Sequence, residues 1–156
     1  MIYCGADPGV TTGLVLIEVT ETSAPVLLRS AQPCGDTVDQ LKVLEDFIQA
    51  SDQLIYESFV PRTGKAMTSD WIAPTYRIGA LETLAWFYHS KEHRPIGRTP
   101  SANKSAVTDE NLKNLDLWGP TGHANRHQRD ASRVVVGHLK GLRHRQTLIA
   151  GWPRVS

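Results

Sequence analysis

The stretch formed by residues 2–17 constrains the fold most, because two short apolar runs flank a tight turn. Runs of this kind are typical of β-strands, and the proline and glycines between them are typical of a tight connection. Asp7 stands in this turn, where the first strand ends. A carboxylate is costly to bury unless a cation or a hydrogen-bond donor meets it. Asp7 is therefore either a turn residue that hydrogen-bonds its own loop or a metal ligand with partners elsewhere.

The other predicted strands follow at intervals that indicate a mixed sheet. Residues 14–19 and 26–30 extend the first strand into an antiparallel meander, because only short turns separate them. Apolar residues at helical spacing predict a helix over residues 37–50, followed by a strand over 53–59 and a short edge strand over 95–99. The strand–helix–strand crossover makes the fourth strand parallel to the first. We expect an α/β fold with a mixed five-stranded sheet, in which three antiparallel strands are followed by parallel strands and helices flank the sheet.

Glu57 lies at the carboxyl end of the fourth predicted strand, beside the strand that carries Asp7. Ligand sites in open α/β sheets lie at this edge. Two neighbouring carboxylates repel each other unless a cation sits between them. Glu57 alone would be interpreted as an exposed acid at a strand end, but the pair favours a cation site.

The second half of the chain is predicted to be mainly helical. Residues 75–91 carry an apolar stripe wider than one sheet face needs, which packing in the core and a subunit interface could together explain. Short helical pieces are expected at 101–107 and 109–117, and a last helix at 125–141. The tail from residue 151 is expected to be irregular.

His127 and Asp130 stand three residues apart, so they share one face of the first turn of the last helix. Alone, such a histidine is more often a cap or a surface residue. With the two strand-end acids, the set offers three carboxylates and one imidazole, which suits Mg²⁺ or Mn²⁺. Two such ions can hold an attacking water and a leaving oxygen during displacement at phosphorus. His127 could bind one ion or orient the water as a general base.

The charges are distributed unevenly along the chain. Residues 1–60 hold two basic side chains against nine acidic ones, whereas residues 61–156 hold fifteen against seven. The basic residues cluster at Arg126, Arg129, Arg133 and again at Lys140, Arg143, Arg145. Such clustering favours a surface that meets a polyanion over scattered solvated charge. The long loop at 60–74, with Arg62 and Lys65, is similarly predicted to touch the substrate.

The composition is that of a soluble, cytoplasmic protein. No apolar run reaches the length of a membrane span, and the N-terminus leads into a strand without the pattern of a signal peptide. Two cysteines, Cys4 and Cys34, are too few for a disulfide framework. We expect no membrane association and a single domain over residues 1–156.

Three motifs, taken in order, resemble a known family. They are Gly5-Ala6-Asp7-Pro8-Gly9, the strand end Ile55-Tyr56-Glu57, and His127-Gln128-Arg129-Asp130-Ala131. Together they look like the RuvC-type Holliday junction resolvases of the ribonuclease H-like superfamily, and the resemblance covers nearly the whole chain. It implies a ribonuclease H-like fold and a homodimeric endonuclease of DNA recombination and repair. Such an enzyme cuts four-way DNA junctions by paired nicks, through metal-dependent phosphodiester hydrolysis.

The resemblance also assigns roles to individual positions. It implies that Asp7, Glu57 and Asp130 bind metal. His127 stands at a position where some members of the family carry histidine and others aspartate. Mg²⁺ or Mn²⁺, two ions per site, would be the cofactor. Lys104 resembles a family lysine that contacts DNA, and the helix from residue 75 would match the dimer helix.

Some positions depart from the family pattern. The family has an aromatic residue just after the glutamate that stacks on junction bases, and Phe59 is near that position but not clearly in register with it. A second family lysine has no clear counterpart. The compact chain is similar to bacteriophage-type members, which implies a cytoplasmic location in a bacterial or phage-infected cell and a substrate range that extends to other branched DNA.

Three other functions fit parts of the pattern. A ribonuclease H-like nuclease for flaps or RNA/DNA hybrids would use the same acids. An ATP-binding relative of actin and Hsp70 would use Asp7 and the following glycines as a phosphate loop, although it would need two such domains. A non-catalytic DNA-binding relative would keep the basic surface and lose the metal site.

Overall fold

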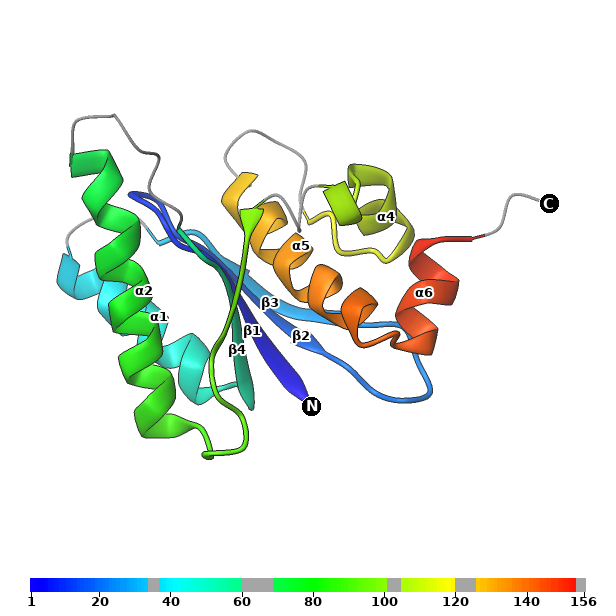
Figure 1. Ribbon diagram of the computed structural model, residues 1–156, viewed down its shortest axis with the longest axis horizontal. Coiled ribbons are helices and arrows are strands. Elements are labelled where there is room, and N and C mark those ends of the chain that lie inside the picture. The colour runs from blue at the N-terminus through cyan, green and yellow to red at the C-terminus, as the bar shows by residue number, and fades with distance from the viewer. Residues whose placement is uncertain (34–36, 60–68, 101–104, 120–125, 154–156) are drawn as a thin grey trace.

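The computed structural model describes residues 1–33, 37–59, 69–100, 105–119 and 126–153. Its centre is a mixed sheet with helices on both faces (Figure 1). The strands are β1 (Ile2–Asp7), β2 (Gly13–Glu18), β3 (Val26–Ala31), β4 (Gln53–Glu57) and β5 (Ile96–Arg98). They lie in the order β3-β2-β1-β4-β5. The first three strands pair antiparallel, and β4 and β5 continue the sheet in parallel, which confirms the predicted topology.

Alternation along β1 divides its side chains between two cores. Cys4 and Ala6 face one layer, where they pack with residues of α1 (Thr37–Gln49) and α2 (Ser69–Tyr88) such as Leu44 and Leu81. Tyr3 faces the other layer, where α5 (Arg126–Gly141) covers β1 and β2. The two short helices α4 (Asp109–Asn114) and α6 (Arg145–Gly151) extend this second layer (Figure 1). None of the described helices is long and apolar enough to cross a membrane.

Two helices differ from the sequence prediction. The predicted start of α2 at residue 75 is wrong, because the helix begins at Ser69 and contains Pro74. Proline is most common in the first turn of a helix. A start next to Pro74 is therefore predicted from the sequence, several residues after the true start. The expectation of an irregular tail from Gly151 is also wrong at that position, since Gly151 is the last residue of α6. This helix is too short to show a period, and its cap is the His144 side chain, which accepts a hydrogen bond from the Thr147 N–H.

Candidate active site

Asp7 and Glu57 end two adjacent parallel strands. The register pairs Ala6 with Tyr56, so the next residue of each strand, Asp7 and Glu57, lies at the same height. Gly5 and Ile55, two positions earlier on these strands, lie on the face that α5 covers. Because side chains alternate along a strand, both carboxylates belong to this face. Both residues are partly buried, and α5 begins at the same edge of the sheet (Figure 1).

His127, in the first turn of α5, contacts the first of these carboxylates. Its Nδ1 lies 2.7 Å from Oδ2 of Asp7. This hydrogen bond raises the pKa of His127, and the charges of Asp7 and Asp130 act in the same direction, while partial burial opposes them. The contact with Asp7 therefore makes His127 easier to protonate than a free histidine side chain.

Two glycines allow α5 to lie close enough for this contact. Gly13 is the β2 partner of Asp7, and a Cβ there would collide with the main-chain carbonyl of His127. At Gly5 a Cβ would lie 2.7 Å from the carbonyl oxygen of Ala131. Real Cβ atoms do not approach this closely, so a larger residue would push the helix away from the sheet. The backbone of α5 thus rests directly on β1 and β2, with His127 above the end of β1.

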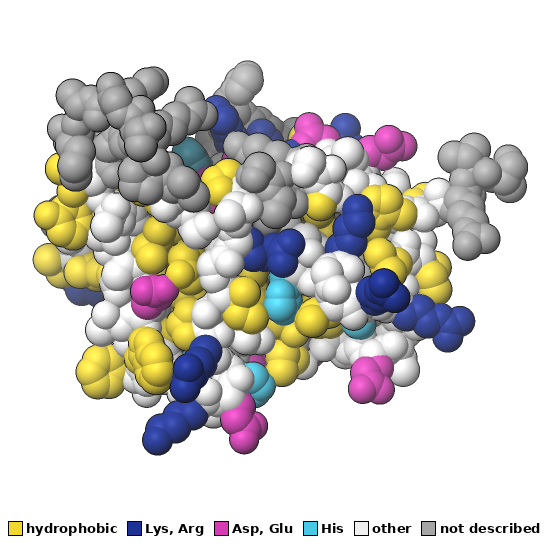
Figure 2. All heavy atoms as spheres, in the orientation of Figure 1, with side chains coloured by type: hydrophobic (Ala, Val, Ile, Leu, Met, Phe, Trp, Pro, Cys, Tyr) yellow, Lys and Arg dark blue, Asp and Glu magenta, His cyan; other side chains and the backbone are white. Residues whose placement is uncertain are grey.

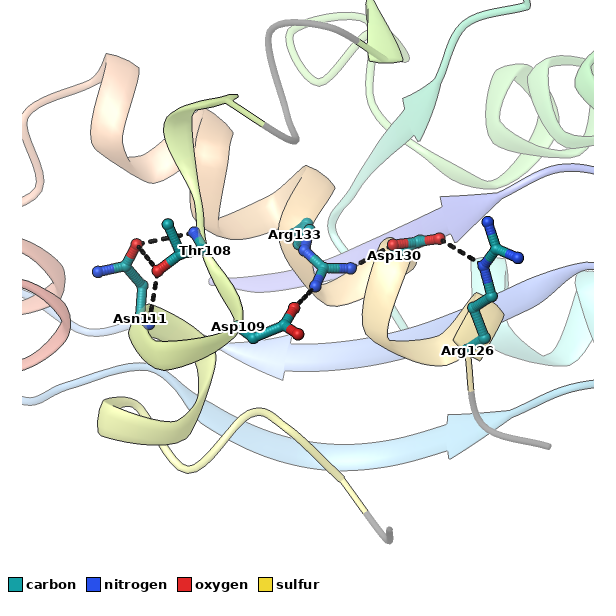
Figure 3. A network of polar contacts seen from close by, with 6 residues as sticks. All are labelled: Thr108, Asp109, Asn111, Arg126, Asp130 and Arg133. Atoms are coloured by element: carbon teal, nitrogen blue, oxygen red, sulfur yellow. Dashed lines mark hydrogen bonds and ion pairs between the residues drawn. The ribbon is translucent and has the colours of Figure 1, made fainter. Parts of the chain in front are cut away.

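Asp130 lies one turn further along α5 and faces arginine side chains (Figure 3). Its carboxylate, with only 9% of the side chain exposed, accepts a hydrogen bond from Nη1 of Arg133. The exposed Arg126 side chain is more distant, with Nε at 3.9 Å. Nη2 of Arg133 donates in turn to Asp109, the first residue of α4. The burial of Arg133 lowers the pKa of its guanidinium, and the negative charge of Glu57 opposes this shift.

The four predicted metal ligands therefore share one sheet edge, but Asp7 and Asp130 have different partners. Asp7 pairs with His127, whereas Asp130 pairs with Arg133. Within the described part of the chain, no three histidine, cysteine or acidic side chains converge into a ready ligand cluster. The donor types nevertheless fit a hard divalent cation, because three carboxylates and an imidazole are the ligands that Mg²⁺ and Mn²⁺ accept.

A cavity of about 480 Å³ opens beside Asp130. Three arginines line it, namely Arg126, Arg129 and Arg133, together with Val107, Thr108, Asp109 and Trp118. The Arg129 guanidinium lies 4.7 Å from the centre of the Trp118 ring, and the Lys113 ammonium lies 4.9 Å from it. The basic lining and the aromatic ring are features of surfaces that bind nucleic acids.

Comparison with known proteins reveals the fold relationship. No protein-family model matches this sequence, and no curated protein matches it. Among solved structures, the Thermus thermophilus RuvC in complex with a Holliday junction substrate is similar, with a TM-score of 0.66 and 17% identity. The match covers 92% of this chain and 95% of that one. A second T. thermophilus RuvC structure gives a TM-score of 0.65 at 16% identity, over 92% of this chain and 96% of the other.

The chain has the RuvC fold. This confirms the predicted ribonuclease H-like architecture, including the mixed sheet and its flanking helices. At such low identity the similarity concerns the fold, and the roles of individual residues remain predictions.

The predicted DNA-binding residues fall into two groups. Arg62, Lys65 and Lys104 lie outside the described residues. Arg126 and Arg129 lie on the first turn of α5 and line the cavity. Phe59 is partly buried two residues after β4 ends, and its predicted stacking role stays a prediction.

The outer face of α2 has the excess of apolar side chains that the sequence indicates. Leu81 and Ala85 pack into the core, whereas Tyr76, Trp86 and Phe87 are exposed, the last to 80%. Figure 2 shows hydrophobic side chains gathered over this side of the molecule. Between α1 and α2 lies a cavity of about 580 Å³, lined mainly by apolar residues such as Leu41, Ile72 and Tyr76.

Sequence reasoning missed the site residues whose importance depends on tertiary contacts. The sequence indicates Arg133 only as part of a basic cluster and Asp109 only as the start of a short helix. The spacing of Asp130 and Arg133 does offer a signal, because residues three apart on a helix are neighbours. Trp118 and the close-packing glycines carry no comparable local pattern.

Proposed function

We propose that this protein is a metal-dependent endonuclease that cuts four-way DNA junctions, and other branched DNA, by paired nicks. One observation carries the proposal: three carboxylates and an imidazole, those of Asp7, Glu57, Asp130 and His127, lie along one edge of a RuvC-type sheet, and Asp7 contacts His127 directly. The RuvC structure with the Holliday junction substrate supports a branched-DNA ligand for this fold. The reaction would be hydrolysis of a phosphodiester bond.

Asp7, Glu57 and Asp130 would hold Mg²⁺ or Mn²⁺, with His127 as a further ligand or as a base. When bound, one or two such ions lower the pKa of water and neutralise charge on the leaving oxygen. Asp7 orients the imidazole by accepting its Nδ1–H, so Nε2 is the nitrogen through which His127 would take a proton or bind an ion. Gly5 and Gly13 allow the backbone of α5 to lie close to the sheet, which places the His127 ring next to Asp7.

The basic cavity would bind the DNA backbone next to the carboxylates. Arg126 and Arg129 offer guanidinium groups that suit phosphate oxygens. Lys104, Arg62 and Lys65 are proposed to add phosphate contacts, and Phe59 to stack on bases. A surface that neutralises several phosphates releases counterions, so binding should weaken steeply as salt rises.

Paired nicks need two sites related by symmetry, which a homodimer provides. We propose that the exposed apolar face of α2 forms this dimer, together with the cavity between α1 and α2. Phe87→Glu would place a charge on this face without touching the core. Light scattering after gel filtration should show a dimer for the wild type and a monomer for this variant, whereas a wild-type monomer would contradict the dimer.

We further propose a bacteriophage-type member that acts in the cytoplasm of a bacterial or phage-infected cell. The buried, unpaired Cys4 thiol is in keeping with a reducing compartment.

A panel of substrates tests the proposed specificity. Purified protein with Mg²⁺ would be incubated with a four-way junction, a three-way fork, a flap and an RNA/DNA hybrid. The proposal predicts paired nicks confined to branched DNA. Cleavage of the hybrid at an equal rate would instead support another ribonuclease H-like nuclease and would overturn the resolvase assignment.

A further inference from the structure

Arg133 is a cation fixed among the acids of the proposed centre. It stands one turn after Asp130 on α5, and only 14% of its side chain is exposed. Its two terminal nitrogens donate to different elements, Nη1 to Asp130 and Nη2 to Asp109 of α4 (Figure 3). The charge of Glu57 also acts on it. The guanidinium therefore already neutralises a carboxylate that the proposed metal centre would use.

Asp130 needs such a partner when no metal ion is bound. A buried carboxylate without a counter-charge is strongly unfavourable. Arg126 is a weak substitute, because its side chain is 70% exposed and its Nε is 3.9 Å away. A divalent ion that binds Asp130 must therefore share this carboxylate with Arg133 or displace it.

Asp109 gives Arg133 a second anion to which it can remain bound. Thr108 caps α4, and its side chain and that of Asn111 form a reciprocal capping box. These bonds fix the first turn of α4, which carries Asp109. The cavity of about 480 Å³ borders both Arg133 and Asp109, so the guanidinium has space to leave Asp130 while it keeps its contact with Asp109.

We propose that Arg133 is an exchangeable counter-cation of Asp130. It neutralises this carboxylate in the metal-free protein and turns to Asp109 when a divalent cation takes Asp130. Arg133 is thus a positioning residue that sets the affinity of the centre for metal. This inference rests on the metal centre of the proposed function, and the experiment below separates the two.

Calorimetric titration of the metal-free, full-length protein with Mn²⁺ tests the exchange. Arg133→Met should bind Mn²⁺ about tenfold more tightly, because the competing charge is gone. Arg133→Lys keeps the competing positive charge, so its affinity for Mn²⁺ should stay within about threefold of that of the wild type. Asp109→Asn should bind about threefold or more weakly, because Arg133 then loses its alternative partner. The side chain of Asp109 is 57% exposed, so this variant tests the exchange even where Arg133→Met does not fold.

Two matched controls separate exchange from general electrostatics. Arg126→Gln removes another positive charge near Asp130, and Glu110→Gln removes the acid next to Asp109; both should change Mn²⁺ affinity by less than about threefold. Unchanged or weaker binding by Arg133→Met, or an equal gain in Arg126→Gln, would overturn the exchange alone. If the wild type binds no Mn²⁺, or Asp130→Asn binds it as well as the wild type does, the proposed metal centre fails too.

Discussion

His127 and Asp7 are 120 positions apart in the sequence, yet Nδ1 of the histidine lies 2.7 Å from Oδ2 of the aspartate. The contact joins the first turn of α5 to the end of β1. The contact forms only when α5 packs in its native position on the sheet. It therefore links the stability of the fold to the geometry of the candidate active site.

The pair predicts a pH-dependent contribution to stability in metal-free buffer. The pKa of His127 is raised above 6.5 by its hydrogen bond to Asp7. A raised pKa in the folded state means that the contribution is complete below pH 6.5 and is lost as the pH rises through the folded pKa. Since the histidine side chain is 37% exposed, the contribution should be about 1 kcal/mol or less.

Urea unfolding of the wild type and His127→Gln at pH 6 and pH 9 measures this contribution. The difference in unfolding free energy should be largest at pH 6 and smaller at pH 9. In an Asp7→Asn background the same histidine substitution should have little pH dependence, which a double-mutant cycle would show. A difference that grows with pH would contradict the assigned ion pair.

Gly13→Ala should loosen α5 from the sheet. The added methyl group would overlap the His127 carbonyl, and overpacking of this kind typically costs about 1–3 kcal/mol. The matched control is Gly79→Ala in α2, where an added Cβ meets nothing within 4 Å. This variant should stabilise the helix by about 0.5–1 kcal/mol. Thermal unfolding checks both variants. Equal stabilities of Gly13→Ala and the wild type would show that the close packing does not matter.

Arg126→Gln should weaken binding to DNA without affecting the fold, because this side chain is exposed at the edge of the basic cavity. Loss of one phosphate contact should lower the slope of log affinity against log salt by about one. Fluorescence anisotropy with a labelled four-way junction, without divalent ions, would measure the slope. Lys91 is an exposed residue after the end of α2, and Lys91→Gln should leave the slope unaltered. If the two variants changed the slope equally, the basic cavity would not be part of the DNA-binding surface.

The fold was predictable because local signals agreed with one topology. Short turns required the first three strands to be antiparallel, and one crossover required the fourth to be parallel. The start of α2 was not predictable in this way, since Pro74 is typical of a first turn but lies inside the helix. α6 depends on tertiary support, for example the hydrogen bond from Asn111 Nδ2 to the Gly151 carbonyl.

The positions of the candidate site residues in the fold were predictable, but their contacts were not. The order of the motifs placed Asp7, Glu57 and His127 at one edge. The partner of Asp130 was harder to foresee, because Arg133 is held by Asp109, an acid 24 positions earlier on another helix. The requirement for glycine at position 13 likewise comes from a backbone carbonyl of α5, which no local pattern reveals.

Cleavage of a synthetic four-way junction by wild type and Asp7→Asn, with Mg²⁺ and with EDTA, tests the central claim most directly. Glu18→Gln is the matched control, because Glu18 is an exposed acid at the far end of β2, opposite Ile2. We predict paired nicks by the wild type and Glu18→Gln in Mg²⁺, and no nicks by Asp7→Asn or in EDTA. Nicks that survive Asp7→Asn or the removal of metal would contradict a metal-dependent site at this edge of the sheet.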